Sequence, residues 1–451
     1  MKFKQSGMLK YGIVLVLLAL PLVGGHDALA EDQTVTVSDT VAAALSYNPR
    51  LKVLQTNQEA ITHEVDQAKG GYYPRVDLSF GYGAESYSDQ FTRSTDIEHN
   101  FYERLDANLQ LSQLLYDGQE TASQVGIEEA KLDSAKERVI DNAESIALDA
   151  IIAHLEVYRQ RVLTELAGQN IRDHEEILGM LNERQKAGAG SIADVTQTEG
   201  RLSRAKATQA ETIALGKKAE ANYQRLVGKL AGNVAFFTPP ADLLPKSIEE
   251  AILAVEANNP KVKALEYNVA EAQSRIDLSD SSFLPKINAV LSSNYTDQPD
   301  SIETYEASNK AMLRLNWNLI NGGSDVAARK AAISRKMQAV NTKDDQLVQV
   351  VEETAATWAE LQAARQRVVA FGDATSYNQK TLDSYMKQFT VGQRTLLDVL
   401  DARNELFQSS GLLVTAKVNE VIASERLLAL AGKLNDSLQM DKTLYIVADN
   451  Q

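Results

Sequence analysis

Asn48-Pro49-Arg50-Leu51, near the start of the 451-residue chain, returns 211 positions later as Asn259-Pro260-Lys261-Val262. At the same offset, Tyr73-Pro74-Arg75-Val76 returns as Leu284-Pro285-Lys286-Ile287. Matches at one fixed offset over such a distance indicate that a whole structural unit is present twice. We therefore predict two tandem repeats with internal pseudo-symmetry, and not a solenoid, which needs three or more repeats.

The later part of each repeat matches at a slightly smaller offset. Leu109-Gln110-Leu111 becomes Leu313-Arg314-Leu315, and Gly228-Lys229-Leu230 becomes Gly432-Lys433-Leu434, both 204 positions later. A single seven-residue length difference ahead of residue 109 explains the change from 211 to 204. The two repeats therefore correspond along most of their length.

The first thirty residues have the three parts of a secretory signal. Three lysines accompany an apolar run from Tyr11 to Val23, and Ala28-Leu29-Ala30 forms an A-x-A cleavage site. A membrane anchor is the alternative, but this run is shorter than the ~20 residues that span a bilayer. We predict that residues 1–30 are a signal peptide and that the protein is exported.

The composition argues against several classes of function. A net charge of −15 at pH 7 disfavours nucleic acid, whose phosphates attract lysine and arginine. The chain has no cysteine, so disulfides and cysteine-linked lipids are impossible. The five histidines are scattered without metal-binding spacing, and we find no enzyme or cofactor motif. We therefore expect no catalysis, no metal site and no cofactor.

The longest parts of each repeat are predicted to be helical, because they lack proline and are rich in helix-forming residues. At 1.5 Å per residue, the longest helices would reach on the order of 100 Å, so they must pack side by side in a coiled coil or a helical barrel. A glycine-containing turn separates each long helix from a returning helix. The expected helices cover 119–186, 192–231, 324–388 and 396–434.

A segment with a different period precedes each long helix. Apolar residues alternate with polar ones, in the first run at Val76, Leu78, Phe80 and Tyr82. Period two indicates strands with one apolar face, and four such runs form hairpins predicted at 75–116 and 286–320. Run length and long polar links are typical of outer-membrane strands. The alternative is a soluble hairpin packed on the protein's own helices.

Four strands per chain are too few to close a barrel. In lipid, an open sheet edge leaves backbone groups without hydrogen-bond partners, and known barrels start at ~8 strands. Membrane insertion therefore requires several copies of the chain to share one barrel. The sequence predicts a mixed α/β membrane protein that is an oligomer.

The predicted organisation follows from these elements. The first repeat covers 31–232 with a helical tip near 188–191, a proline-containing linker covers 233–246, and the second repeat covers 247–434 with a tip near 391–395. Residues 435–451 are predicted as a C-terminal tail. Thr36-x-x-Asp39 and Ser247-x-x-Glu250 resemble capping boxes of short helices that break before each Asn-Pro.

This pattern resembles the TolC family of outer-membrane channel proteins over nearly the whole exported chain. The most specific stretch runs from Val391 to Ala402 and is similar to the family's V-G-x-R-T-x-x-D-V-L-D-A signature. The resemblance implies a homotrimer with a twelve-stranded β-barrel in outer-membrane lipid, continued by a long periplasmic α-helical barrel. It also implies an exit duct that works with a periplasmic adaptor, or membrane fusion protein, and an inner-membrane ABC or proton-driven transporter.

The resemblance also implies roles for five residues at the periplasmic tip. Asp398 and Asp401 would face the pore and form rings of carboxylates that constrict it. Arg394 and Asp194 would belong to the polar links that latch the tip helices together. Phe389 stands where a tyrosine is expected, so one latch hydrogen bond would be missing.

Helix capping is an alternative explanation for two of these carboxylates. Thr395-x-x-Asp398 and Ser191-x-x-Asp194 have the spacing of capping boxes at helix starts. Asp401 has no such role, and its counterpart in the first repeat is Gln197. We therefore expect Asp398 to act in capping or in the pore, or in both, and Asp401 to act in the pore.

The leading functional interpretation is a passive exit duct, with type I protein secretion slightly favoured over small-molecule efflux of drugs or metals. A periplasmic coiled-coil adaptor or adhesin is a second interpretation, although such proteins lack two amphipathic strand pairs. An enzyme is a third, and the absence of nucleophile, phosphate-binding and metal-ligand motifs argues against it.

Overall fold

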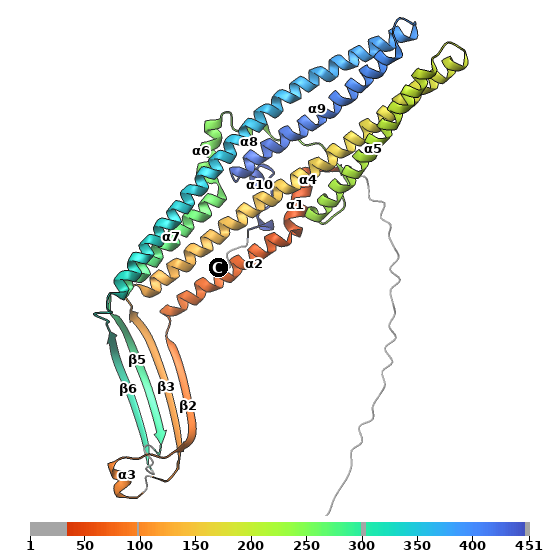
Figure 1. Ribbon diagram of the computed structural model, residues 1–451. Helices are drawn as coiled ribbons and strands as arrows, with labels where there is room; N and C mark the ends of the chain where they lie inside the picture. Colours follow the sequence, from red (N-terminus) through yellow and green to blue (C-terminus); the bar gives the residue numbers. More distant parts are fainter. Residues whose placement is uncertain (1–33, 97–98, 299–303, 447–451) are drawn as a thin grey trace, which may run out of the picture.

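The computed structural model describes residues 34–96, 99–298 and 304–446, so the predicted signal peptide lies outside the described residues. The described chain is a long rod (Figure 1). A twisted sheet forms one end, and two helical hairpins extend to the other end, where each makes a sharp turn. α2 and α7 run from the sheet towards the middle of the rod, where α1, α6 and α10 also lie (Figure 1).

Two pairs of short helices begin the two repeats, and each pair breaks at an Asn-Pro step. The Asn48 side chain accepts a hydrogen bond from the Arg50 amide at 2.9 Å, and the Asn259 side chain accepts one from the Val262 amide at 3.0 Å. The proline in the first turn has no N–H to satisfy. These helices are α1 (Val37–Tyr47), α2 (Pro49–Lys69), α6 (Ile248–Asn258) and α7 (Pro260–Ser281).

The predicted capping boxes of these helices differ in the structure. Thr36 and Asp39 form the reciprocal box at the start of α1. At the start of α6, Ser247 accepts from the Glu250 amide at 3.2 Å, but the Glu250 carboxylate accepts from the amide of Lys246 and not from that of Ser247. The second box is therefore incomplete.

The alternating segments form one antiparallel sheet in the order β2-β3-β5-β6. Its strands are β2 (Arg75–Glu85), β3 (Tyr102–Tyr116), β5 (Lys286–Asp297) and β6 (Tyr305–Asn316). A one-turn helix, α3 (Gln90–Ser94), lies in the link between β2 and β3. β3 and β5 join the two repeats at the centre, which leaves β2 and β6 at the edges.

Four long helices make the two hairpins. They are α4 (Glu120–Lys186), α5 (Ile192–Val227), α8 (Ser324–Thr390) and α9 (Leu396–Leu430), with ends within four residues of the predicted ones. α4 and α8 contain 67 residues each, on the order of 100 Å of helix. Gly188 and Gly392 take φ of 73° and 77° in the tip turns, a conformation that favours glycine.

The main apolar core lies midway along the hairpins, where α4 is surrounded by α1, α5 and α9. The segment predicted as a tail is folded here as far as Ile446, because Leu438 and Tyr445 are buried in this core. It contains α10 (Leu434–Ser437) and a short 3₁₀ turn, Lys442–Leu444. The segment predicted as a C-terminal tail is thus part of the folded core as far as Ile446.

A buried carboxylate holds that C-terminal segment in place. The Glu144 side chain of α4 accepts hydrogen bonds from the amides of Leu434 and Asn435 at 2.8 and 3.2 Å. The predicted linker also contributes structure, since β4 (Asn233–Val234) pairs in parallel with β1 (Thr34–Val35). 3₁₀ turns at Gly70–Tyr72 and Ala241–Leu243 complete the described elements.

Candidate functional site

One face of the sheet is apolar and exposed in the single chain. The strand register places Leu78, Leu109 and Ser293 in one row, and Val76, Leu111 and Leu291 in the next. Leu78 and Leu313 are 74% and 73% exposed, although such side chains normally avoid water. An exposed apolar surface of this extent marks a contact with lipid or protein.

Aromatic side chains lie near both ends of this apolar face. Tyr295 and Tyr305 stack at 6.0 Å near the ends of β5 and β6 that lead into their connecting loop. At the other end, just past β6, the indole N–H of Trp317 donates to the Phe283 carbonyl at 3.1 Å. Aromatic belts of this kind flank the apolar band of outer-membrane strands.

The opposite face of the sheet is polar. The Thr296 hydroxyl donates to Asp106 at 2.9 Å across the β3–β5 junction. Asp106 also accepts from Arg104, which forms a second ion pair with Glu85 at 2.7 Å. One apolar and one polar face suit a sheet between lipid and an aqueous lumen.

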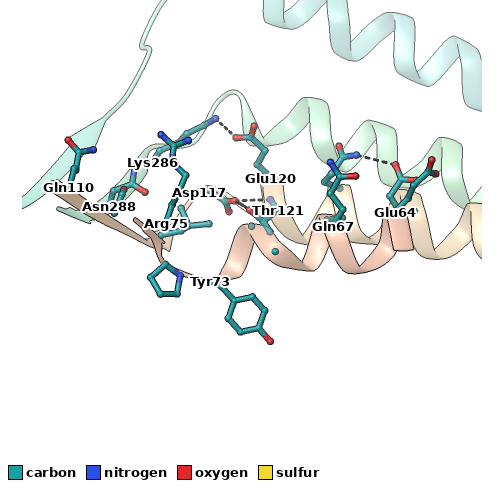
Figure 2. Close-up of a pocket in the computed structure, with 18 of the residues that line it drawn as sticks. Glu64, Gln67, Tyr73, Arg75, Gln110, Asp117, Glu120, Thr121, Lys286 and Asn288 are labelled. Atoms are coloured by element: carbon teal, nitrogen blue, oxygen red, sulfur yellow. Dashed lines mark hydrogen bonds and ion pairs between the residues drawn. The ribbon is translucent and has the colours of Figure 1, made fainter. Parts of the chain in front are cut away.

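A hollow of about 970 Å³ lies where the sheet meets the helices (Figure 2). Lys286 at the start of β5 is ion-paired with Glu120 at the start of α4, and Asp117 accepts from the Thr121 amide at 2.7 Å. Gln110 and Asn288 extend the lining onto the polar face of the sheet. The polar surface therefore continues from the strands onto α2 and α4.

The predicted tip residues lie at the far end of the rod, in the turn between α8 and α9. The Thr395 hydroxyl donates to the Asp398 carboxylate at 2.7 Å and accepts from the Asp398 amide at 3.4 Å. Thr395 therefore caps α9. The reciprocal capping box is incomplete, because the Asp398 carboxylate binds the Thr395 hydroxyl and not its backbone amide, and the Asp398 side chain stays 37% exposed. The exposed oxygen leaves the pore role open to test.

Arg394 links the two helices of its own hairpin. Its guanidinium lies 4.1 Å from the centre of the Tyr385 ring of α8 and donates to Gln388 at 3.2 Å. It also approaches Asp398 at 3.7 Å. Asp194 lies in the first turn of α5, in the other hairpin, and is not among these partners.

The predicted capping box at Asp194 is also absent. Ser191 caps α5 by accepting from the amide of Ala193 at 3.1 Å, and not from that of Asp194. The shorter reach to Ala193 satisfies the helix end without the aspartate. Asp194 therefore contributes only its charge near the positive end of α5.

Phe389 is buried at the end of α8 and touches the other hairpin. The Arg184 guanidinium of α4 lies 5.3 Å from the centre of its ring, within the range of a cation–π contact. Phe389 belongs to a small apolar cluster with Leu181 and Leu382. The aromatic ring, without a hydroxyl, thus joins the two hairpins at the tip.

Asp401 is ion-paired across the hairpins, which the sequence reasoning missed. Arg201 of α5 contacts its carboxylate at 2.8 Å, while 59% of the Asp401 side chain stays exposed. A second bridge of the same kind joins Arg403 of α9 to Asp173 of α4. Asp401 therefore has a structural partner as well as an exposed oxygen. Charge alone could not reveal this, because the pair is separated by 200 positions.

Two kinds of feature are absent from the described part of the chain. In it, no helix has the length and apolarity needed to cross a membrane. Nor do three or more histidine, aspartate or glutamate side chains gather there in a possible metal site.

The structure combines an amphipathic four-stranded sheet with two long helical hairpins, the architecture of a class of outer-membrane proteins. The model of the outer membrane efflux protein family matches residues 40–229 and 252–433, one match in each repeat. The chain belongs to this family. It is a TolC-family protein of the outer membrane that extends into the periplasm, and the family consists of channels and not enzymes.

Curated relatives include both efflux and secretion proteins. The outer membrane efflux protein BepC of Brucella suis is 27% identical over 95% of this chain and 92% of its own length. The alkaline protease secretion protein AprF of Pseudomonas aeruginosa is 24% identical, with coverage of 87% and 84%.

Solved structures share the fold at low identity. The outer-membrane channel OprN has a TM-score of 0.76 at 16% identity and covers 88% of this chain and 90% of its own. CusC has a TM-score of 0.74 at 15% identity, with coverage of 90% and 92%.

Proposed function

We propose that three copies of the chain form one duct from the periplasm through the outer membrane. The observation that carries this proposal is a four-stranded sheet with an exposed apolar face and two unpaired edges. Three copies supply twelve strands, which satisfies the backbone groups at every edge. Their α4, α5, α8 and α9 helices then continue the lumen as a twelve-helix tunnel.

The duct is passive and acts in a tripartite system. An inner-membrane transporter of the ABC or proton-driven class supplies the energy, and a periplasmic adaptor joins it to the helical tips. The family's channels work with such partners. In this duct, Asp398 and Asp401 form the constriction, while Arg394 and Phe389 hold the tip helices, with Asp194 contributing charge nearby.

For the cargo, we propose type I secretion of a protein. The similarity to AprF, an alkaline protease secretion protein that matches most of the chain, supports this choice. Efflux of small molecules is the second candidate, supported by the similarity to BepC, an outer membrane efflux protein. Both cargoes are compatible with one duct because the transporter selects what enters it.

Deleting the gene and restoring it on a plasmid tests the two cargoes together. Loss of one or a few proteins from the culture medium, restored by the plasmid, would support secretion. Increased sensitivity to dyes, detergents or metals with an unchanged medium would support efflux instead. Purified protein that fails to conduct ions in planar bilayers would contradict the duct itself.

A further inference from the structure

The strands of the two hairpins in the sheet pair in equivalent registers. In the first, Val76 pairs with Leu111, and in the second, Ile287 pairs with Leu315. Moving the first pair by the repeat offsets, 211 for β2 and 204 for β3, gives the second pair. The same operation converts the pair at the loop end, Glu85 and Tyr102, into Thr296 and Glu306. The repeat offsets therefore describe the structure as well as the sequence.

Each chain also contains one junction between repeats, where β3 pairs with β5. Adding 204 to the β3 residue numbers gives β6, and subtracting 211 from the β5 residue numbers gives β2. The equivalent junction therefore joins β6 to a β2 strand. Within one chain β2 and β6 lie at opposite edges of the sheet, so this β2 belongs to another copy. The junction that one chain shows thus acts as a template for the one between chains.

We propose that β6 pairs with β2 of the neighbouring copy in the register of the β3–β5 junction, which sets Lys310 opposite Glu85 of that copy. This inference rests on the proposed shared barrel and adds its register. The pair derives from Asp106 and Thr296, which lie opposite one another and are hydrogen-bonded at 2.9 Å. A polar contact within the chain becomes an ion pair between chains.

The charges on the polar face suit this pairing. Lys310 is exposed on the polar side of edge strand β6. Glu85 ends edge strand β2 and already binds Arg104 at 2.7 Å. The proposed register places a second cation beside Glu85. Opposite charges that face one another across antiparallel strands stabilise the pairing.

Side-chain size is complementary on the same face. The long side chains of Met312 and Arg314 lie opposite Gly83 and Gly81 of the neighbouring copy. A Cβ atom at Gly83 would meet no atom within 4 Å, and one at Gly81 would meet only Asp106 at 3.9 Å. The lumen side of β2 therefore has room for both long side chains. Arg314 then extends over Gly81 towards Asp106.

On the other face, the register matches apolar residues with apolar residues. Four successive pairs are Ala311 with Ala84, Leu313 with Tyr82, Leu315 with Phe80 and Trp317 with Leu78. Several of these side chains are more than half exposed in the single chain, including Phe80 at 68% and Leu315 at 59%. The proposed junction continues the apolar band around the barrel.

Registers shifted by two residues keep the two faces but lose the charge pair. One shift sets Lys310 opposite Gly83, and the other sets it opposite Tyr87. A shift of one residue would instead turn apolar side chains into the lumen. Charge, size and polarity therefore favour one register of the edge strands.

Disulfide cross-linking between introduced cysteine pairs can identify the register, because the natural chain has no cysteine of its own. The matched variant is Ala84→Cys/Ala311→Cys, with a second matched variant, Gly83→Cys/Met312→Cys, on the lumen face. Opposite Cβ atoms lie about 4.5–5.5 Å apart, whereas diagonal ones lie about 7–8 Å apart. The controls Ala84→Cys/Asn309→Cys and Ala84→Cys/Leu313→Cys represent the two shifted registers.

Purified variants are oxidised with copper phenanthroline, and their covalent size is measured in denaturing detergent. We expect covalent dimers and trimers from either matched variant, formed at least tenfold faster than from the controls. A control that cross-links faster, or a native trimer in which neither matched pair cross-links, would overturn the register. A wild-type protein that is monomeric by native mass would instead contradict the proposed shared barrel.

Discussion

The two longest helices of the molecule occupy equivalent places in the repeats but differ greatly in burial. α4 and α8 contain 67 residues each, yet α4 buries 25 of them and α8 only seven. The first 26 residues of α8 include no buried one. Related sequences in equivalent places thus have different surroundings within one chain.

The difference follows from what packs around each helix. α4 contacts α2, α7, α5 and α9, whereas α8 contacts mainly α7, α9 and α6. The strands show the same contrast, since central β3 is half-buried while edge strand β2 is exposed on both faces. The first repeat's helix and the central strands are covered by their own chain. α8 and the edge strands have the surfaces expected of groups covered by another copy.

The largest effect is expected on the sheet. Leu109→Arg places a charge on the apolar face at the middle of β3 and should disfavour membrane insertion by ~2–4 kcal/mol per chain near the bilayer midplane. Gln110→Arg, on the polar face, should be tolerated. Leu315→Arg with Asn316→Arg repeats the test near the aromatic end of β6, where the cost of a charge on the apolar face is smaller. Outer-membrane fractionation and heat-modifiable migration measure insertion. Equal damage at both faces would show that the assigned orientation is wrong.

A matched pair of substitutions compares α4 with α8 directly. Glu144→Ala removes the acceptor of the Leu434 and Asn435 amides and should lower the free energy of unfolding by about 2–4 kcal/mol. Its counterpart 204 positions later is Val348, which is 67% exposed, so Val348→Ala should change stability by less than about 0.5 kcal/mol.

Thermal unfolding and limited proteolysis near residue 434 measure both variants. Early cleavage is expected only in Glu144→Ala, because its C-terminal segment loses its anchor. If Val348→Ala is as damaging as Glu144→Ala, this face of α8 is covered in the assembly and the contrast between the helices is smaller than the single chain suggests.

A smaller effect concerns Glu425, fully buried on α9, whose carboxylate oxygens have no hydrogen-bond partner in the described part of the chain. Burial raises the pKa of Glu425 to about 7, above the ~4.3 of an exposed glutamate. At low pH the Glu425 carboxyl is neutral and its burial is tolerated. The free energy of unfolding falls as the pH rises through 7, because the ionised carboxylate is disfavoured in the buried site.

Glu425→Gln should accordingly raise the free energy of unfolding at pH 8 by on the order of 2 kcal/mol and have little effect at pH 4. Unfolding midpoints at the two pH values give the comparison. Glu353→Gln, at an exposed site on α8, serves as the control and should show no such dependence. A Glu425→Gln variant that is equally stable relative to wild type at both pH values would contradict the account.

At the tip, a modest change in stability and a large change in conductance are expected. Asp398→Ala/Asp401→Ala removes six carboxylates from a trimer and should abolish block of single-channel current by polyvalent cations. Arg394→Ala should raise the resting conductance by loosening α8 from α9. If the aspartates act only at the helix end, their substitution should lower the free energy of unfolding by ~0.5–2 kcal/mol and leave the cation block intact.

The Arg201 contact changes how the Asp401 result is interpreted. Asp401→Ala alone removes the ion-pair partner of a mostly buried guanidinium, so a loss of tip stability is expected too. Arg201→Gln removes the same bridge but keeps both carboxylates. Cation block that survives in Arg201→Gln and disappears in Asp401→Ala would assign the effect to the pore.

The sequence predicted the elements well wherever local chemistry determines them. Alternation marked the strands, and glycine turns marked the tips at Gly188 and Gly392. Family membership and the outer-membrane location were confirmed. Glycine in a helix interior disfavours the helix locally, yet Gly126, Gly168 and Gly179 do not interrupt α4, which packs on α2, α7, α5 and α9.

Contacts between distant segments were not predicted. The bridge from Arg201 to Asp401 and the cation–π contact from Arg184 to Phe389 join the two hairpins, and no local pattern in either hairpin specifies the partner. The C-terminal segment was missed for the same reason, since its anchor Glu144 lies 290 residues before Leu434. Such contacts depend on the three-dimensional arrangement and not on periodicity.

We propose that the exposed α8 surface and the open edges of the sheet are covered by further copies of the chain. The native mass of detergent-purified wild-type protein tests this most directly. Three chains per particle, with heat-dependent dissociation to single chains in denaturing detergent, is the predicted result. A stable single chain that still inserts into membranes and conducts ions would contradict the account.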